Sequence, residues 1–451
     1  MTRQPRRYAG DVTPSTALLT DRYELTMVDA ALASGTAHRR SMFELFARRL
    51  SGGRRYGVVA GTGRLLEAIE QFRFTDAELD WLREEDFLRP ETLDWLADYR
   101  FTGNIWGYPE GEVFFPGSPI LIVESTFAEG VLLETLALSI LNADSAVATA
   151  ASRMSHAANG KPLAEMGSRR TSERSAVAAA RAAYIAGFTA TSNLEAGRSY
   201  GIPTMGTAAH AFTLLHDSEQ AAFEAQIAAL GTGTTLLVDT YDIEQGVRTA
   251  IEVAGTDLGA VRIDSGDLPV VVAQVRDLLD SLGATRTKIT VTNDLDEYTV
   301  ASLAFSPVDS FGVGTSVVVG SGTPTLGMVY KLVARTDDAG GWVSVAKKST
   351  DKASVGGRKS VRRVFDASGR ARTELILLGD GPGGEPEGAD LTSPNREVLV
   401  PLVIDGTVQD GFTGSDGIAA ARERHTRCVA ELPPIAMRLT RGDPAIATEY
   451  R

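Results

Sequence analysis

The chain has 451 residues, of which 43% are hydrophobic and 23% charged, which is typical of soluble globular proteins with more than one ordinary domain. Its formal net charge of -13 argues against a nucleic-acid surface or an anionic membrane as the main partner. The single cysteine, Cys428, excludes an intrachain disulfide and a cysteine metal cluster. With no signal-peptide pattern after the basic start and no apolar run of about 18 residues, we expect a cytoplasmic protein.

The first 200 residues predict a mixed α/β region followed by close-packed helices. LTDRYELTMVDAALASG (19–35) has the pattern of an amphipathic helix that ends at Gly35, and SPILIVEST (118–126) suits a strand. From about 140 to 200 the chain is rich in Ala and Ser, and interspersed Leu, Ile and Tyr favour a packed core over low complexity. We therefore expect helices that approach one another closely here.

Between about 200 and 320, strand-like runs that end in polar residues alternate with helical patterns, which indicates parallel βα units. In the helix after the third run, Ser265 is the expected N-cap and Gly283 the expected end. In such folds the chemistry gathers at the carboxyl ends of the strands, where the polar residues of each run stand. The five runs are 202–210, 234–242, 260–267, 288–296 and 310–316.

After residue 325 the pattern becomes β-rich. VYKLVART and WVSVAKKS flank DDAGG (337–341), which predicts a β-hairpin. TELILL (373–378) and EVLVPLVI (397–404) have the composition of strands. These segments predict a smaller lobe that packs against the barrel together with the N-terminal region.

His210 is the histidine of greatest interest among the five in the chain. It follows a predicted strand in a Gly-Thr-Ala-Ala turn, where small neighbours leave its imidazole accessible. A lone histidine is more often structural than catalytic, but Asp239 ends the next βα unit and could hold one ring nitrogen while the other stays nucleophilic.

RIDSGD (262–267) places one arginine, two carboxylates and a helix start within six residues. Arg262 could meet a carboxylate through two hydrogen bonds, and Asp264 could serve Mg²⁺ or a ribose hydroxyl. Helix N-termini also bind phosphate through their free N–H groups. The alternative is an ordinary N-cap with a solvated ion pair.

Other polar and glycine-rich segments are weaker candidates for anion binding. GSRRT (167–171) could clamp a phosphate or carboxylate or be a surface cap, and FGVGTS (311–316) and GSGTPTLG (320–327) are either phosphate turns or ordinary ones. NDLD (293–296) could bind ribose hydroxyls or cap a helix, and KKSTDKASVGGRK (347–359) is a solvated basic loop or one that closes over a polyphosphate.

Taken together, these segments resemble the nicotinate phosphoribosyltransferase family. Each match is weak, but they occur in the order of the family and span residues of roughly 18 to 360. The matching pieces are LLTDRYELTM (18–27), GSRRT (167–171), GTAAH (206–210), VDTYD (238–242), RIDSGDL (262–268), NDLDE (293–297), FGVGTS (311–316) and KKSTDK (347–352).

The resemblance implies an α/β fold: an irregular βα barrel of the type II phosphoribosyltransferase kind plus a smaller α/β lobe built from both termini. The expected divisions are 10–136 for the N-terminal part of the lobe, 137–335 for the barrel and 336–451 for the C-terminal part of the lobe, with the basic loop near 347–359. It also implies a homodimer in which the lobe of one subunit completes the active site of the other.

The implied reaction joins nicotinate to 5-phospho-α-D-ribose 1-diphosphate, in the presence of Mg²⁺, and couples this step to ATP hydrolysis through a phosphohistidine. No firm metal ligand is implied, because Mg²⁺ is expected to arrive with the substrate phosphates. His210 would be the phosphorylated residue and Asp239 its orienting partner. The expected substrate residues are Tyr23, Arg169, Thr207, Arg262 and Asn193 for nicotinate; Asp264, Asn293, Asp294, Gly314 and Thr315 for the ribose phosphate; and Lys347, Lys348 and Lys352 for ATP phosphates.

Two positions depart from the pattern of the family. Met166 stands where many relatives carry an aromatic residue, although a thioether can also pack on a pyridine ring. Gly356 stands where proline is expected, which predicts a looser basic loop.

Rival interpretations differ in substrate or in class. In a nicotinamide phosphoribosyltransferase we expect an acidic residue at the position of Asn193, whereas a neutral residue does not repel a carboxylate and favours nicotinate. A quinolinate enzyme would need more basic residues for a second carboxylate. A non-catalytic barrel that senses a nucleotide is a further alternative. An aldolase is disfavoured because none of the five expected strand ends offers a Schiff-base lysine.

Overall fold

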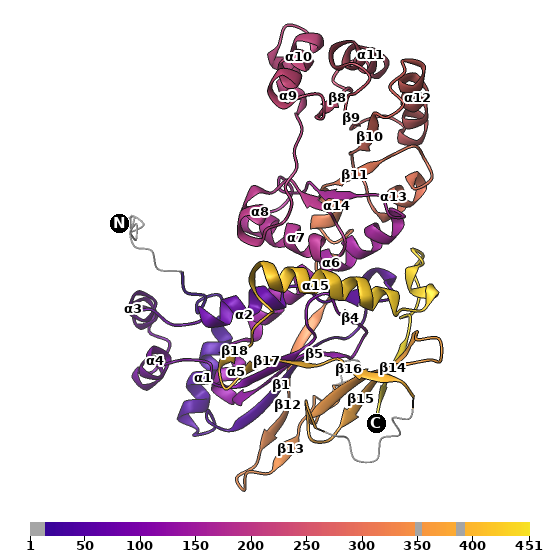
Figure 1. Ribbon diagram of the computed structural model, residues 1–451. Helices are drawn as coiled ribbons and strands as arrows, with labels where there is room; N and C mark the ends of the chain where they lie inside the picture. Colours follow the sequence, from indigo (N-terminus) through magenta and orange to yellow (C-terminus); the bar gives the residue numbers. More distant parts are fainter. Residues whose placement is uncertain (1–13, 348–353, 385–392) are drawn as a thin grey trace.

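The computed structural model describes residues 14–347, 354–384 and 393–451. The molecule has two large hydrophobic clusters: one fills a lobe built from both ends of the chain, and the other fills a barrel domain. Figure 1 shows the barrel above the lobe, with helix α15 (Gly414–Ala430) between them.

An antiparallel seven-stranded sheet forms the centre of the lobe. Its strands, in spatial order, are β13 (Trp342–Ser344), β12 (Met328–Thr336), β1 (Arg40–Ala47), β5 (Pro119–Thr126), β3 (Asn104–Gly107), β17 (Val400–Ile404) and β18 (Thr407–Val408). The helices of this region are α1 (Arg22–Ala33), α2 (Thr62–Glu70), α3 (Asp76–Glu85), α4 (Pro90–Ala97) and α5 (Phe127–Val131). Seven of the eight residues of β1 are buried, as expected of a central strand.

The hairpin of β12 and β13 confirms the one predicted around 337–341. The barrel boundary expected at residue 335 does not match the division between the sheets, because β12 pairs with β1 inside the lobe. Its position in the lobe follows from the register of β1, which places Phe43 opposite Leu332 and Leu45 opposite Tyr330.

A second, four-stranded sheet lies beside this one and holds the C-terminus. Its order is β16 (Asn395–Glu397), β14 (Lys359–Phe365), β15 (Ala371–Leu378) and β19 (Ala447–Tyr450). The predicted strands at 373–378 and 397–404 thus belong to different sheets, as β15 and β17. A short pair, β2 (Gly57–Val58) with β4 (Val113–Phe114), packs in the barrel cluster.

The barrel domain contains a six-stranded parallel sheet. Its spatial order is β7 (Ala190–Thr191), β6 (Leu163–Glu165), β11 (Ser310–Val313), β10 (Lys288–Val291), β9 (Ala260–Ile263) and β8 (Thr235–Leu237). Its helices are α6 (Glu134–Ala157), α7 (Glu173–Ile185), α8 (Leu194–Tyr200), α9 (His210–Leu215), α10 (Glu219–Leu230), α11 (Ile243–Ala254), α12 (Leu268–Ser281), α13 (Glu297–Leu303) and α14 (Thr315–Val318). The first strand, β6, pairs with the last, β11, so the sheet curls into a partial barrel.

Four of the five predicted βα runs contain a strand at the expected place, but the run at 202–210 does not. Only one bridge forms there, between Thr204 and Thr191 of β7. Pro203 has no N–H to donate, so the segment cannot continue a regular ladder. The barrel therefore has this segment at one edge and β8 at the other.

Helix α12 corrects a local prediction. It begins at Leu268 after Asp267, and the hydroxyl of Ser265 donates to Asp239 instead of capping the helix. Gly266, with φ of 90°, turns the chain between Ser265 and the helix. Gly283 follows the helix, as predicted.

The helical run Phe127–Ala157 corrects the expectation that no segment is long and apolar enough to cross a membrane. By length and composition it passes that test, with a mean hydropathy of 1.5. However, 67% of its most apolar window is buried within the structure, as in the core helix of a soluble protein. In Figure 1, α6 lies at the junction of the lobe and the barrel, which accounts for its apolar surface.

Candidate active site

Arg262 joins three turns at the carboxyl end of the barrel sheet. Its Nη1 donates to Thr207 Oγ1 at 2.8 Å and to the Ala208 carbonyl at 3.2 Å, and its Nε donates to Thr292 Oγ1 at 3.1 Å. Thr292 Oγ1 in turn donates to Asp264 Oδ1 at 2.6 Å. The structure thus brings three predicted site residues, Arg262, Thr207 and Asp264, into one network.

The charged side chains of this network are partly exposed to solvent, so a substrate can contact them. The Arg262 side chain is 15% exposed and that of Asp264 is 32% exposed, with Arg262 Nη2 at 3.6 Å from Asp264 Oδ2. A cation and a carboxylate side by side at a barrel mouth can bind an anionic group and a hydroxyl-bearing group together.

His210 begins α9 and is half-buried, but its partner differs from the predicted one. Its Nδ1 lies 3.1 Å from Thr240 Oγ1. Asp239, next to Thr240 in the chain, instead accepts from the Asp264 N–H and the Ser265 hydroxyl, both at 2.7 Å, through Oδ2. Asp239 therefore shapes the turn that holds Asp264, because strand β9 lies directly beside β8.

The other oxygen of Asp239 is buried without a hydrogen-bond partner among the described residues. Glu219, at the start of α10, also has a buried oxygen without a partner in that part of the chain. Burial, together with the charges of Asp242 and Asp239, raises the pKa of Glu219.

The predicted nicotinate residues near β6 and β7 also meet. Asn193 Nδ2 donates to Ser168 Oγ at 3.1 Å, and Asn193 Oδ1 caps α8 by accepting from the Ala196 N–H at 2.9 Å. Arg169, next to Ser168, has an exposed side chain. A cavity of about 890 Å³ adjoins Ser168 and Asn193 and extends along α7 and α8 to Arg174 and Arg198.

Met166 and two glycines connect these turns to the end of β11. A Cβ atom on Gly312 would lie 2.6 Å from Met166 Sδ and 2.6 Å from Thr292 Cγ2. A Cβ on Gly167 would lie 2.2 Å from Val318 Cγ1 and 2.9 Å from the Gly314 carbonyl oxygen. Only glycine fits at both positions. Because Met166 and Thr292 both lie against Gly312, Met166 is close to the network of Arg262, which includes Thr292.

Apart from Asp264, the predicted ribose-phosphate residues lie on two neighbouring turns. Asn293 and Asp294 are exposed after β10, and Asn293 has a φ of 104°, a strained conformation for a residue with a side chain. Gly314 precedes α14, and Thr315 begins it with an exposed side chain. Because β10 and β11 are adjacent parallel strands, both turns open at the same edge of the sheet.

Two groups of predicted residues lie elsewhere. Tyr23 is on α1 in the lobe, 45% exposed and beside Glu134; burial and the charges of Glu134 and Glu24 raise its pKa. Figure 1 shows α1 and strands β8 to β10 at opposite ends of the molecule. Lys347 is exposed, and Lys348 and Lys352 lie outside the described residues.

The site also contains several polar residues that the sequence did not predict. Thr240, Thr292, Ser168 and Ser265 each stand within one or two residues of a predicted site residue, but a hydroxyl side chain is too common to be recognised by itself. Their place at the ends of successive strands was the available signal.

Comparison with known proteins shows the family of the chain. A sequence model of the nicotinate phosphoribosyltransferase N-terminal domain matches residues 18–142. Two nicotinate phosphoribosyltransferases of Mycobacterium tuberculosis are 55% and 40% identical to the chain; the first alignment covers 96% of this chain and 94% of that protein, and the second 93% and 88%.

Solved structures extend the comparison to the fold. Human nicotinic acid phosphoribosyltransferase superposes with a TM-score of 0.80 at 25% identity, covering 96% of this chain and 97% of that one. A nicotinate-nucleotide pyrophosphorylase of Pyrococcus furiosus, 22% identical, shares the fold with a TM-score of 0.74 over 96% of this chain and 100% of that one. By its sequence and its fold, the chain belongs to the nicotinate phosphoribosyltransferase family.

Proposed function

We propose that this protein joins nicotinate to 5-phospho-α-D-ribose 1-diphosphate, giving nicotinate mononucleotide and pyrophosphate. The observation that carries the proposal is the network of Arg262, Thr207, Thr292 and Asp264 at the barrel mouth, beside the turn of His210. Membership of the family supplies the substrates, since the relatives carry nicotinate phosphoribosyltransferase in their names.

The ring nitrogen of nicotinate is already a nucleophile, so the site needs to align the substrates more than to remove a proton. Arg262 or Arg169 can hold the carboxylate through two hydrogen bonds, because a guanidinium matches its geometry. Met166 offers a thioether for the flat face of the ring. Asp264, with Asn293 and Thr315 on the neighbouring turns, can meet the ribose hydroxyls and the phosphate.

Mg²⁺ fits the oxygen-rich edge of this site. Among the described residues, no three His, Cys, Asp or Glu side chains gather into a metal site. The ion would therefore be held mainly by substrate phosphates, and the part-exposed Asp264 is the carboxylate of this network that could contact it. When bound there, Mg²⁺ stabilises the negative charge of the departing pyrophosphate. Asp264 and Arg262 then position the sugar and the anion.

We further propose that His210 carries a phosphoryl group taken from ATP and couples ATP hydrolysis to synthesis. The contact between Nδ1 and Thr240 leaves Nε2 as the nitrogen that can accept the phosphoryl group. Phosphorylation would replace a neutral or cationic ring with an anion beside the substrates and change their affinity.

Substitution of His210 by alanine tests this coupling. We expect His210→Ala to lose the stimulation by ATP and to keep some ATP-independent synthesis, because the bond-forming step needs only alignment. The measurement is nicotinate mononucleotide formation with and without ATP, together with transfer of label from ATP to protein as an acid-labile, alkali-stable phosphate. Loss of synthesis under both conditions would place the histidine in the chemical step instead.

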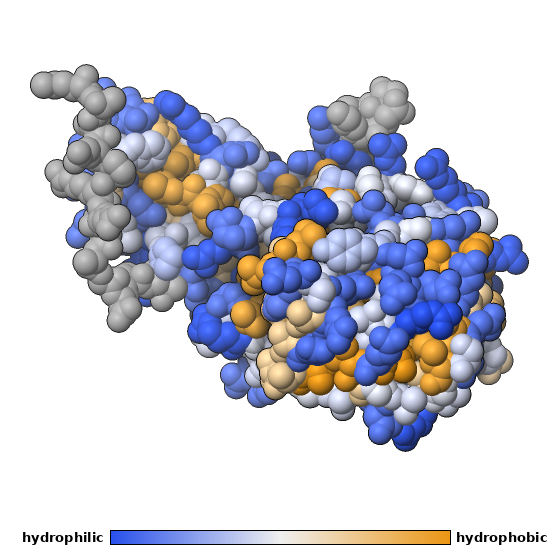
Figure 2. All heavy atoms as spheres, turned by 90° about the horizontal axis from the view of Figure 1, so that it is seen from above, coloured by the Kyte–Doolittle hydropathy of each residue, from blue (hydrophilic) through white to orange (hydrophobic). Residues whose placement is uncertain are grey.

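We also propose a homodimer in which Tyr23 of one subunit stacks on the nicotinate bound by the other. Tyr23 is about half exposed and belongs to a different domain from the barrel turns. Leu214 and Leu215 are exposed on α9, the helix that begins at His210, and they offer apolar surface for a second copy. Figure 2 shows hydrophobic patches between hydrophilic residues on the face seen from above.

A further inference from the structure

Two turns that carry predicted nicotinate residues are joined by a ring of hydrogen bonds around one carboxyl group. Glu165, the last residue of β6, accepts from the Gly167 N–H through Oε1 and from the Thr191 hydroxyl, at 2.6 Å, through Oε2. Thr191 Oγ1 accepts from the Asn193 N–H at 3.0 Å. The bond from Asn193 to Ser168 closes the ring back onto the turn of Gly167.

The carboxyl group at the centre of this ring is buried and has no cationic partner among the described residues. Glu165 is 1% exposed and Thr191 is fully buried. Burial raises the pKa of Glu165, against the hydrogen bonds from Thr191 and Gly167. A buried carboxyl group costs folding free energy unless donors satisfy it, so both of its contacts matter for the local structure.

Thr191 extends the ring to a third turn. Its N–H donates to the Pro203 carbonyl at 3.0 Å, and its carbonyl accepts from the Met205 N–H at 2.9 Å. Thr207, two residues after Met205, is the partner of Arg262. A movement of Thr191 would therefore also move the segment that carries Thr207.

The turn of Arg169 is held from both sides. Gly167 lies between the Glu165 carboxyl group and the Gly314 carbonyl with no space for a side chain. The Arg169 side chain is exposed, and its position follows from the backbone of this turn. Asn193, on the other turn, has both of its amide atoms occupied by hydrogen bonds, so its orientation also follows from the ring.

We infer that Glu165 and Thr191 are positioning residues that set the separation of Arg169 and Asn193, and thereby the preference for a pyridine carboxylate over the neutral amide. The inference rests on the proposed function. Neither residue touches substrate; each acts through the turn that it holds.

The test compares Glu165→Gln and Thr191→Val with wild-type enzyme. The side chain of Gln has one oxygen to accept the two hydrogen bonds that the Gly167 N–H and the Thr191 hydroxyl donate to Glu165. Val keeps the shape of Thr without its hydroxyl. In both variants we expect KM for nicotinate to rise about tenfold, the effect of losing about 1.4 kcal/mol of binding free energy, with kcat and KM for the ribose diphosphate nearly unchanged. The preference for nicotinate over nicotinamide should fall in both variants. Thr191→Ser keeps the hydroxyl, so its KM for nicotinate and its preference for nicotinate should equal those of wild type.

Thr287→Val is the matched control. Thr287 is also buried in the barrel domain, but its hydroxyl has no hydrogen-bond partner among the described residues, so the same chemical change breaks no contact. Its KM for nicotinate should equal that of wild type. Hydrogen exchange of peptides covering 166–171 and 191–196 adds a readout that does not depend on activity: it should accelerate in Glu165→Gln and Thr191→Val and not in the control.

The outcomes separate this inference from the proposed function. Failure of the wild-type protein to form nicotinate mononucleotide contradicts the proposed function. An active wild type, with unchanged KM for nicotinate and unchanged exchange in Glu165→Gln and Thr191→Val, contradicts the positioning role alone. A fall in kcat equal for nicotinate and nicotinamide would also contradict it, because positioning for the carboxylate should separate the two substrates.

Discussion

Glu24 shows how a single buried carboxyl group ties the helix of Tyr23 to the start of α6. It accepts from the Thr20 hydroxyl and from Thr135, whose N–H lies at 2.9 Å and whose hydroxyl lies at 2.5 Å. Thr135 belongs to the first turn of α6, so this side chain connects α1 with the longest helix of the structure. Burial raises the pKa of Glu24 from 4.5 to about 7.

This shift predicts a pH dependence of stability. Between about pH 4.5 and 7 the folded state holds a proton on Glu24 that the unfolded state has released, so its contribution to stability is lost as pH rises through that interval. The loss amounts to up to about 3 kcal/mol. Urea unfolding of wild type and Glu24→Gln at pH 5 and pH 8 should show a smaller decline in the variant; parallel declines would contradict the assignment.

Neighbours along the chain were predictable at the residue scale, and neighbours across the fold were not. RIDSGD placed Arg262 beside Asp264, and the structure keeps them together. By contrast, Asp239 was expected to hold His210, yet it bonds the turn of Asp264 while Thr240 contacts the ring. Adjacent side chains at the end of a strand point in different directions, and the sequence alone does not show whether Asp239 or Thr240 faces the imidazole of His210.

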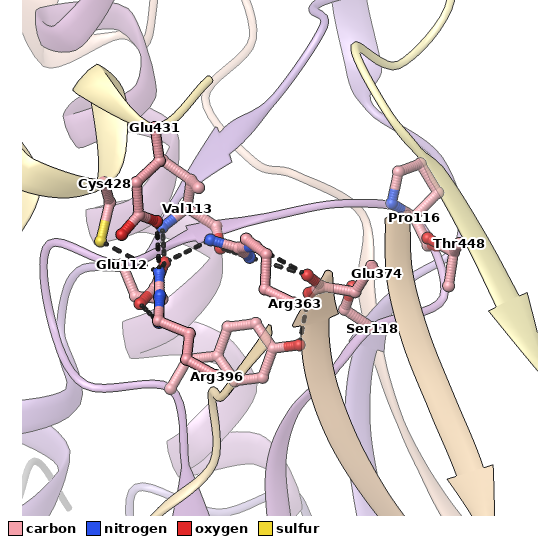
Figure 3. Close-up of polar contacts among 11 residues, drawn as sticks. Glu112, Val113, Pro116, Ser118, Arg363, Glu374, Arg396, Cys428, Glu431 and Thr448 are labelled. Atoms are coloured by element: carbon pink, nitrogen blue, oxygen red, sulfur yellow. Dashed lines mark hydrogen bonds and ion pairs between the residues drawn. The ribbon is translucent and has the colours of Figure 1, made fainter. Parts of the chain in front are cut away.

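At the scale of elements, one ion-pair network joins the four-stranded sheet to the loop before β4 and to the end of α15. Arg363 of β14 is fully buried; it contacts Glu374 Oε2 through Nε at 2.9 Å and Nη2 at 2.8 Å, and Glu112 Oε1 through Nη1 at 2.6 Å. Arg396 of β16 adds bonds to Glu112 and to Glu431. Figure 3 shows these side chains converging from strands, a loop and the end of α15.

Removal of one member of this network should be costly. Arg363→Met leaves Glu374 buried without its cation, so we expect a loss of about 3–5 kcal/mol in the free energy of unfolding. Arg362→Met, on the same strand, removes a half-buried arginine that donates to Asn395 and should cost less than about 1 kcal/mol. Urea unfolding measures both, and equal losses would contradict the account.

The alternation of strands and helices predicted most barrel elements, because hydrophobic periodicity reports burial directly. Strands β8 to β11 lie inside the predicted runs, and α12 buries Leu268, Val272, Val275 and Leu279. The segment at 202–210 was mispredicted, since its composition suits a strand but Pro203 interrupts the ladder. Which strands pair across the sheet, such as β6 with β11, depends on contacts that no local pattern records.

For the whole molecule, a shared active site can be tested by mixing subunits. Tyr23→Ala and Arg262→Ala should each be nearly inactive, and each leaves the other half of a site intact. After the two variants exchange subunits, half of the dimers are hybrids with one intact site of two, so about a quarter of wild-type activity should return. No recovery in a mixture shown to contain hybrids would place both residues in the site of one subunit.

A product assay with purified protein, 5-phospho-α-D-ribose 1-diphosphate and Mg²⁺ tests the proposed activity itself. Nicotinate and nicotinamide are offered separately, each with and without ATP. We expect nicotinate mononucleotide as the product, faster synthesis with ATP, and little turnover of nicotinamide. Turnover of neither substrate, or a preference for nicotinamide, would contradict it.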